Sequence, residues 1–175
     1  MVWWMWLLFL LLINQRLVEL KIARRNERWM KERGGIEKGQ GHYKWFLLMH
    51  TAFFLSIIVE VMTTNNAPIE GINIVLFSLF ACTQVVRIWC IYTLGRFWNT
   101  KIIVIPGVSL IKKGPYKFIK HPNYIIVGIE LFIIPMLFKA YMTAFLFPIL
   151  HIILLIVRIP SEERALAESL TDVTK

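Results

Sequence analysis

The sequence predicts an all-α integral membrane protein with about five transmembrane helices. Of its 175 residues, 57% are apolar and 18% are charged, whereas an ordinary soluble domain has roughly 45–50% and about 25%. So short a chain cannot bury several apolar runs of about 20 residues in one soluble core. We therefore expect one membrane domain over residues 1–175, with the lipid bilayer around its apolar surface.

Five apolar segments have lengths close to those that span a bilayer. They lie at roughly residues 2–20, 45–63, 69–94, 122–138 and 140–159. The first segment opens with tryptophans, which are typical of a membrane interface. Pro135 is expected to kink or end the fourth segment.

The basic residues indicate how the segments are oriented. Lys and Arg are concentrated in the first and third connections and follow the last segment, while the second connection, residues 63–70, has none. By the positive-inside rule, the first and third connections and the C-terminus are cytosolic, and the N-terminus is outside. The formal charge of +9 is therefore attributed to topology and anionic lipid, not to nucleic acid.

Both basic connections have local patterns of their own. Residues 17–33 of the first connection form an amphipathic stretch, which predicts an interfacial helix. The third connection, from Gly95 to Lys120, is β-branched over Ile102–Ile105 and then has turn signals at Pro106-Gly107 and Gly114-Pro115. This pattern predicts a re-entrant or hairpin loop at the cytosolic membrane face, where a site could be built.

The first candidate site precedes the fourth segment and runs from Gly114 to Tyr124. Pro122 suits the first turn of a helix, because the N–H that proline lacks would be unsatisfied there. His121 then lies at the cap, beside free backbone N–H groups and the positive end of the helix dipole. This position favours binding of an anionic or hydrogen-bond-accepting group.

The second candidate site follows the fifth segment and runs from Arg158 to Leu166. Ser161 followed by Glu162 and Glu163 predicts the start of a short amphipathic C-terminal helix, with Ser161 as its N-cap. An alternative is that Arg158 only reaches toward the membrane surface while the glutamates complement a helix dipole.

Together, Gly114-Pro115-Tyr116, His121-Pro122-Asn123-Tyr124 and Arg158 with Glu162, Glu163 and Leu166 resemble the isoprenylcysteine carboxyl methyltransferase family. The resemblance covers residues 94–166 and implies a cofactor-binding half over residues 95–175. It implies that Arg158 and Glu162 are catalytic and that Arg158 faces the acceptor. It also implies binding of S-adenosylmethionine by Val108, Ser109, Leu110, Ile111, Tyr116, His121, Pro122, Asn123, Tyr124, Glu162 and Glu163. Two positions depart from the family pattern: Lys120 replaces an arginine, and Lys101 stands where a cofactor-contacting polar residue can occur.

Ionisable residues within the apolar segments are further candidates, because an unpaired charge is costly in lipid. Glu130 lies eight residues into the fourth segment and is predicted to line the acceptor cavity. Pairing of Glu130 with Arg87 remains the structural alternative. Cys82 and Cys90 are interpreted as small apolar residues, and no metal site is expected.

The resemblance implies methyl transfer to the carboxylate or enolic hydroxyl of a lipophilic acceptor at the cytosolic face. In the family, acceptors include prenylated cysteine and, among bacterial relatives, alkylpyrones. The short chain and five-segment layout favour an alkylpyrone-like lipid and a bacterial plasma membrane. Two other classes stay open: a non-catalytic membrane scaffold and an NADPH-dependent membrane reductase. The sequence does not indicate an oligomeric state.

Overall fold

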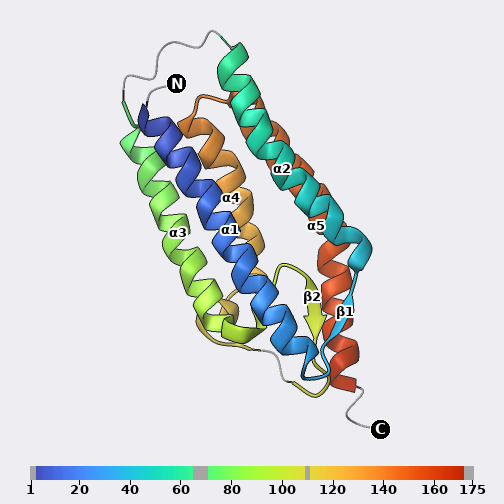
Figure 1. Cartoon of the computed structure of the whole chain (residues 1–175). Coiled ribbons are helices and arrows are strands. Elements are labelled where there is room, and N and C mark those ends of the chain that lie inside the picture. Colours follow the sequence, from blue (N-terminus) through green and yellow to red (C-terminus); the bar gives the residue numbers. More distant parts are fainter. Residues whose placement is uncertain (1–2, 65–70, 109–110, 172–175) are drawn as a thin grey trace.

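The computed structural model describes residues 3–64, 71–108 and 111–171. Within them lie five α-helices, as the sequence predicted (Figure 1). The elements are α1 (Trp3–Lys31), β1 (Ile36–Lys38), α2 (Gln40–Thr63), α3 (Ile74–Leu94), β2 (Ile102–Val104), α4 (Pro122–Leu137) and α5 (Tyr141–Thr171), with 3-10 turns at Gly95–Phe97 and Gly114–Lys117. In this part of the chain, three helices are long and apolar enough to cross a membrane: Tyr43–Thr63, Ile74–Phe97 and Tyr141–Ser169. The shorter α4 is also apolar, so the chain is an all-α integral membrane protein.

The helices form a bundle in which α4 packs against α3 and α5, and α2 packs along α5. The α1 helix joins this bundle through buried apolar side chains such as Met5, Phe9 and Leu12. The Phe9 ring makes edge contacts with Phe54 on α2 and with Phe138 after α4. Burial of large aromatic groups at these crossings fixes the helix positions, because each ring removes much apolar area from its surroundings.

The two ends of the bundle differ in charge. The first and third connections lie together with the end of α5, whereas the start of α1 and the α4–α5 connection lie at the opposite end (Figure 1). We call the former the basic end, since it carries the lysine-rich segments. The alternation predicted from the charges is therefore present in the fold, and its orientation relative to cytosol stays a prediction.

The first segment and the predicted interfacial helix are one continuous helix, α1. Neither Gly nor Pro interrupts residues 3–31, and buried polar contacts hold the second half of this helix in the bundle. Asn26 is buried, and its side-chain amide donates to the carbonyls of Gly95 (3.0 Å) and Trp98 (2.7 Å). A separate helix lying on the membrane surface was therefore a wrong expectation.

The predicted C-terminal helix is likewise part of one helix, α5, which continues through Pro160. Ser161 is not an N-cap, because its hydroxyl donates to the Val157 carbonyl within the helix at 2.8 Å. Proline removes one backbone donor from the helix, and the neighbouring turns continue on both sides of it. Arg158 and Glu162 consequently lie one turn apart on a single rigid helix.

The β-branched segment of the third connection forms strand β2, but its partner is not in the same connection. It pairs antiparallel with β1 of the first connection, with Ile36 opposite Val104 and Lys38 opposite Ile102. The predicted local hairpin is therefore corrected to a two-stranded sheet between the two basic connections. All three residues of β2 are buried, and pairing with β1 satisfies the backbone groups that this burial removes from water.

Ion pairs of Lys101 hold the two connections together. Its ammonium donates to Glu27 of α1 at 2.8 Å and lies 3.3 Å from Glu37 of β1. The hydrogen bond to Glu27 raises the pKa of Lys101, and partial burial offsets part of that effect. Lys101 therefore links α1, β1 and the start of β2.

Candidate functional site

The two sequence motifs meet through the hydroxyl of Tyr124. Arg158 donates from Nε to this oxygen at 2.7 Å, and the hydroxyl donates to Glu162 Oε2 at 2.5 Å. Arg158 also donates from Nη2 to the Thr100 carbonyl at 2.6 Å. Because these groups come from α4, α5 and the third connection, one tyrosine ties together three distant parts of the chain.

His121 completes this arrangement at the start of α4. Its ring stacks on Tyr124 with centroids 5.4 Å apart, and its Nδ1 lies 3.8 Å from Glu162 Oε2. Its Nε2 lies 3.5 Å from Glu163 Oε1. Pro122 occupies the first turn of α4, as predicted. The imidazole and two carboxylates therefore face one another where α4 begins and α5 leaves the apolar core.

A large cavity of about 780 Å³ opens beside these groups at the basic end. Its volume falls within the roughly 300–1,000 Å³ typical of small-molecule sites. Its lining combines the His121, Glu162 and Glu163 side chains with apolar residues of β2 and with Tyr116. Burial raises the pKa of the Tyr116 hydroxyl, so this hydroxyl stays protonated at neutral pH.

A smaller cavity of about 270 Å³, also lined by Tyr124, lies within the bundle. It is mostly apolar, with walls from α1, α2, α4 and α5. Arg158 lines it, with its guanidinium 4.9 Å from the centroid of the Phe46 ring. Among the described residues, no carboxylate lies within 4.0 Å of this guanidinium, so its charge has no direct counter-ion.

The two cavities share a wall. Trp98, Asn99, Asn123 and Tyr124 line both of them. The Oδ1 atom of Asn123 is buried and has no hydrogen-bond partner in the described structure. The shared wall therefore contains an unused hydrogen-bond acceptor.

A buried ionic cluster is defined by Arg16, Glu19, Arg87 and Glu130, and all of its members except Glu130 line the smaller cavity. Arg87 donates to both oxygens of Glu19, at 2.6 and 3.0 Å, and also to Glu130. Arg16 bridges the same two carboxylates at 2.9 and 2.6 Å. Two positive and two negative groups balance, as burial in an apolar layer requires.

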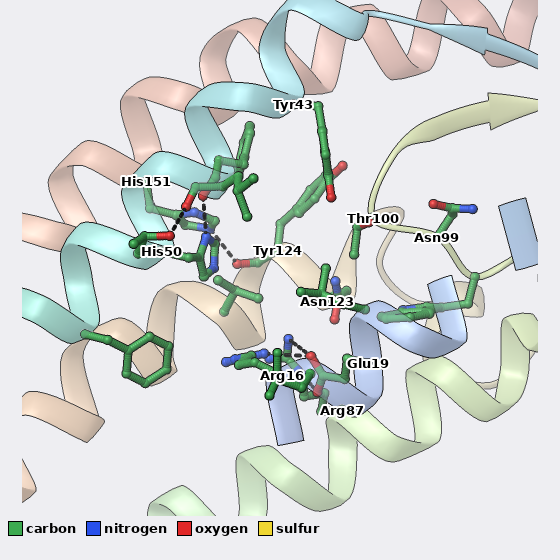
Figure 2. Close-up of a pocket in the computed structure, with 18 of the residues that line it drawn as sticks. Arg16, Glu19, Tyr43, His50, Arg87, Asn99, Thr100, Asn123, Tyr124 and His151 are labelled. Carbon is green, nitrogen blue, oxygen red and sulfur yellow. Dashed lines mark hydrogen bonds and ion pairs between the residues drawn. The ribbon is translucent and has the colours of Figure 1, made fainter. Parts of the chain in front are cut away.

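Figure 2 shows how these groups surround the smaller cavity. His50 and His151 lie on one side of the view, and Arg16, Glu19 and Arg87 lie on the other, with Tyr124 between them. Glu130 is 1% exposed and is not among the lining residues of this cavity. Its carboxylate instead lies behind Arg16 and Arg87, so the pairing with Arg87 that was the alternative reading is present.

Of the other predicted cofactor residues, some line the larger cavity, one is buried and does not line it, and two lie outside the described residues. Val108, Ile111 and Tyr116 line the larger cavity. Pro122 is buried beneath it and does not line it. Ser109 and Leu110 lie outside the described residues.

The sequence motifs did not identify the residues that come from α1, α2 and the start of the third connection. These are Arg16, Glu19, Tyr43, Phe46, His50, Trp98, Asn99 and Thr100, all of which line the smaller cavity. The available signal was chemical: His50, Arg16 and Glu19 are polar groups inside apolar segments, where such residues often mark functional sites. Their mutual pairing could not be inferred, because they lie far apart in sequence.

Comparisons with known proteins identify the family of this chain. A family model described as "Isoprenylcysteine carboxyl methyltransferase (ICMT) family" matches residues 73–168, more than half of the chain. The protein YpbQ of Bacillus subtilis, described as uncharacterized, is 49% identical over 93% of this chain and 96% of its own length. An uncharacterized protein of Haemophilus influenzae is 26% identical over 91% of this chain and 92% of its own length. No solved structure gives a significant match. The chain therefore belongs to the isoprenylcysteine carboxyl methyltransferase family of membrane methyltransferases.

Proposed function

We propose that this protein transfers a methyl group from S-adenosylmethionine to an oxygen at the polar end of a lipophilic acceptor. The cofactor binds in the larger cavity at the basic end, and the acceptor head binds in the smaller cavity. Membership of the family supports the methyltransferase chemistry. The cytosol supplies the cofactor, which agrees with the positive-inside orientation of the basic end.

The residues of the larger cavity fit this cofactor. Its amino group and sulfonium are cationic, and the cavity offers the carboxylates of Glu162 and Glu163 together with the unpaired Oδ1 of Asn123. An orphaned buried acceptor is costly unless a donor reaches it. Val108, Ile111 and Tyr116 offer an apolar and aromatic surface for the adenosine part.

The smaller cavity fits the head of an amphiphile. Its walls are largely apolar, and Arg158 is the cation there that lacks a direct counter-ion among the described residues. Arg158 has Nη1 and one further N–H free after its bonds to Tyr124 and Thr100, so it can hold an ionised oxygen by charge-assisted hydrogen bonds. The preferred acceptor is an alkylpyrone-like lipid, and a prenylcysteine-type carboxylate is the alternative.

When bound, S-adenosylmethionine supplies a methyl group on a sulfonium, whose transfer to an oxygen anion neutralises both charges. The chain's own contribution is orientation and the exclusion of water between the cavities. Tyr124 sets the position of Arg158 on one side and Glu162 on the other. Glu130 acts through Arg16 and Arg87, whose guanidiniums it fixes at the acceptor cavity.

The observation that carries the proposal is the chain of contacts from Arg158 through Tyr124 to Glu162 and His121, with Tyr124 lining both cavities. A scaffold has no need of a shared wall with unused hydrogen-bonding atoms. A reductase would require a site for a nicotinamide cofactor instead.

Calorimetry of the detergent-purified protein with S-adenosylhomocysteine and, separately, with NADPH tests the proposal. We expect S-adenosylhomocysteine to bind and NADPH not to bind. His121→Ala and Glu162→Ala should weaken S-adenosylhomocysteine roughly 10- to 100-fold, because each removes a hydrogen bond that involves a charged group. Arg158→Ala should keep that affinity and lose turnover.

Glu32→Ala is the matched control for Glu162→Ala, since its side chain is 72% exposed in the turn after α1 and lies outside both cavities. Unchanged S-adenosylhomocysteine affinity in both His121→Ala and Glu162→Ala would refute the site. Binding of NADPH alone would replace the methyltransferase proposal with the reductase, and binding of neither cofactor would favour the scaffold.

A further inference from the structure

An exposed turn with basic and apolar side chains lies between β2 and α4. We call residues 111–120 the basic turn, since they include four lysines and no acidic residue. The lysines are Lys112, Lys113, Lys117 and Lys120. At the tip of the turn, Phe118 is 79% exposed and Ile119 is 46% exposed. Lysines beside exposed aromatic and aliphatic side chains are typical of surfaces that meet the membrane interface.

The neighbouring helices place the basic turn at the edge of the lipid-facing surface. Trp89 and Tyr92, near the end of α3, are 49% and 86% exposed, and exposed aromatics of this kind mark the membrane interface. A Cβ added to Gly114 would lie 3.1 Å from the Trp89 indole nitrogen, so the turn packs on α3 at this level. On α4, Ile125 and Ile129 continue the exposed apolar surface away from the turn. The turn therefore lies where headgroups meet the apolar layer.

The backbone of the turn suits such a place. The N–H groups of Phe118 and Ile119 both donate to the Pro115 carbonyl at 3.1 Å, and the Tyr116 N–H donates to the Lys113 carbonyl at 3.1 Å. Unpaired backbone groups are costly beside an apolar layer. Because these N–H groups are already bonded within the turn, its apolar tip can contact lipid without exposing them.

The charge of the turn is largely uncompensated. Lys120 pairs with Glu163 at 3.2 Å, but both side chains are exposed, so the pair contributes little. The other three lysines form no ion pair with a carboxylate that the structure describes. The Lys117 ammonium instead lies 5.9 Å from the centroid of the Phe118 ring. Like charges held in one short segment repel, and an anionic group outside the protein would relieve this repulsion.

The same turn forms part of the wall of the larger cavity. Lys112, Tyr116, Lys117 and Phe118 all line it. His121, which faces Glu162 and Glu163 in this cavity, directly follows the turn. A contact that orders the turn would therefore order one wall of the larger cavity as well.

We propose that anionic phospholipid headgroups dock on the basic turn and thereby raise the affinity of the larger cavity for its cofactor. The headgroup phosphates accept from the three uncompensated lysines, while Phe118 and Ile119 contact the acyl boundary. The cofactor part of this inference rests on the proposed function, whereas the docking part does not. Each lysine near an anionic membrane surface contributes roughly fivefold to binding. A wall ordered by lipid no longer has to be ordered by the cofactor, which lowers the entropic cost of binding it.

The test compares the full chain in nanodiscs of phosphatidylcholine with the same chain in nanodiscs containing about one third phosphatidylglycerol. Without cofactor, hydrogen–deuterium exchange of residues 117–120 should be at least roughly threefold slower with phosphatidylglycerol. Calorimetry should then show S-adenosylhomocysteine binding at least roughly fivefold more tightly in those discs. This ligand carries no net charge near neutral pH, so lipid charge affects its affinity through the protein.

Two variants and one control assign the effect to the turn. Lys112→Gln/Lys113→Gln/Lys117→Gln should bring both lipid ratios below about twofold. Phe118→Ser keeps the lysines and should reduce the exchange ratio, because the apolar contact is lost. The charge-matched control is Lys21→Gln/Arg24→Gln/Arg25→Gln, which removes three exposed positive charges of α1 that line neither cavity. This control should keep both ratios.

Equal exchange and equal S-adenosylhomocysteine affinity in the two wild-type discs would overturn the inference, and this comparison needs no variant. Full ratios in the triple-lysine variant, or equal loss in the α1 control, would also overturn it. If millimolar inorganic phosphate in phosphatidylcholine discs reproduces both effects, the ligand is a soluble anion and docking on lipid is refuted. If S-adenosylhomocysteine binds in neither disc, the proposed function fails, and slower exchange with phosphatidylglycerol would still support docking.

Discussion

Removal of one charge from the buried ionic cluster gives the sharpest test of how this bundle is held together. Glu130→Gln keeps the size and shape of the side chain and removes its negative charge. In the native protein, Glu130 accepts from Arg16 at 2.6 Å, from Gln84 at 2.8 Å and from Arg87. The variant leaves two guanidiniums with Glu19 as the single carboxylate of the cluster.

The size of the effect follows from this imbalance. Breaking a buried pair by neutralising one partner costs about 3–5 kcal/mol, because the other charge stays buried without compensation. A chain of this size loses roughly 2–4 °C of Tm per kcal/mol. We therefore expect Glu130→Gln to unfold about 6–20 °C below the wild type, measured by the helical circular dichroism signal during heating in detergent.

Two companion variants separate charge balance from side-chain loss. Glu130→Gln combined with Arg16→Gln restores neutrality while Arg87 keeps both bonds to Glu19, so at least half of the lost Tm should return. Glu32→Gln changes an exposed carboxylate in the turn after α1 and should leave Tm unchanged. A Tm for Glu130→Gln within about 2 °C of the wild type would refute the view that the cluster depends on balanced charge.

Three further predictions concern the site and its frame. Tyr124→Phe removes the hydroxyl between Arg158 and Glu162, so kcat/KM should fall roughly 100-fold while the protein remains folded by circular dichroism. Gly114→Ala should lower Tm and S-adenosylhomocysteine affinity, because Gly114 has φ +52 and a Cβ there would lie 2.7 Å from a Thr93 side-chain oxygen. Gly71→Ala is the control and should change neither quantity, because no atom lies within 4 Å of a Cβ added there. Glu60→Ala should lower Tm by about 1–8 °C, because its carboxylate accepts from the first free N–H groups of α5; Glu60→Gln should retain part of that stability.

Much of the fold could be predicted from local patterns. Apolar segment length and the distribution of Lys and Arg indicated five helices and placed the two basic connections at one end. What could not be predicted depends on contacts between distant residues. The β-branched run at Ile102–Val104 indicated a strand, but nothing in its sequence identified Ile36–Lys38 as the partner. Three-residue strands are too short to carry a distinctive alternation.

The predictions of where helices begin and end were wrong for a related reason. Ser161 after Pro160 is a typical N-cap signal, and the alternation of charge after Leu17 is typical of a surface helix. Both signals are local, whereas the continuous α1 and α5 helices depend on tertiary contacts, such as those of Asn26 with the third connection. Tertiary packing overrides such signals when it satisfies the same groups in another way.

Part of the candidate site could be predicted from local motifs and part could not, and Tyr124 links the two parts. Motif spacing was sufficient to single out residues that meet at the basic end, since His121, Tyr124 and Glu162 belong to two short stretches with recognisable residue types. The smaller cavity draws on α1 and α2, whose polar residues carry no spacing signal. Tyr124 serves both sides, because its hydroxyl lies between Arg158 and Glu162 while its carbonyl accepts from His151. A shift of α4 by even part of a turn would disturb both cavities together, so under the proposed function the position of this helix would couple binding of the cofactor to binding of the acceptor.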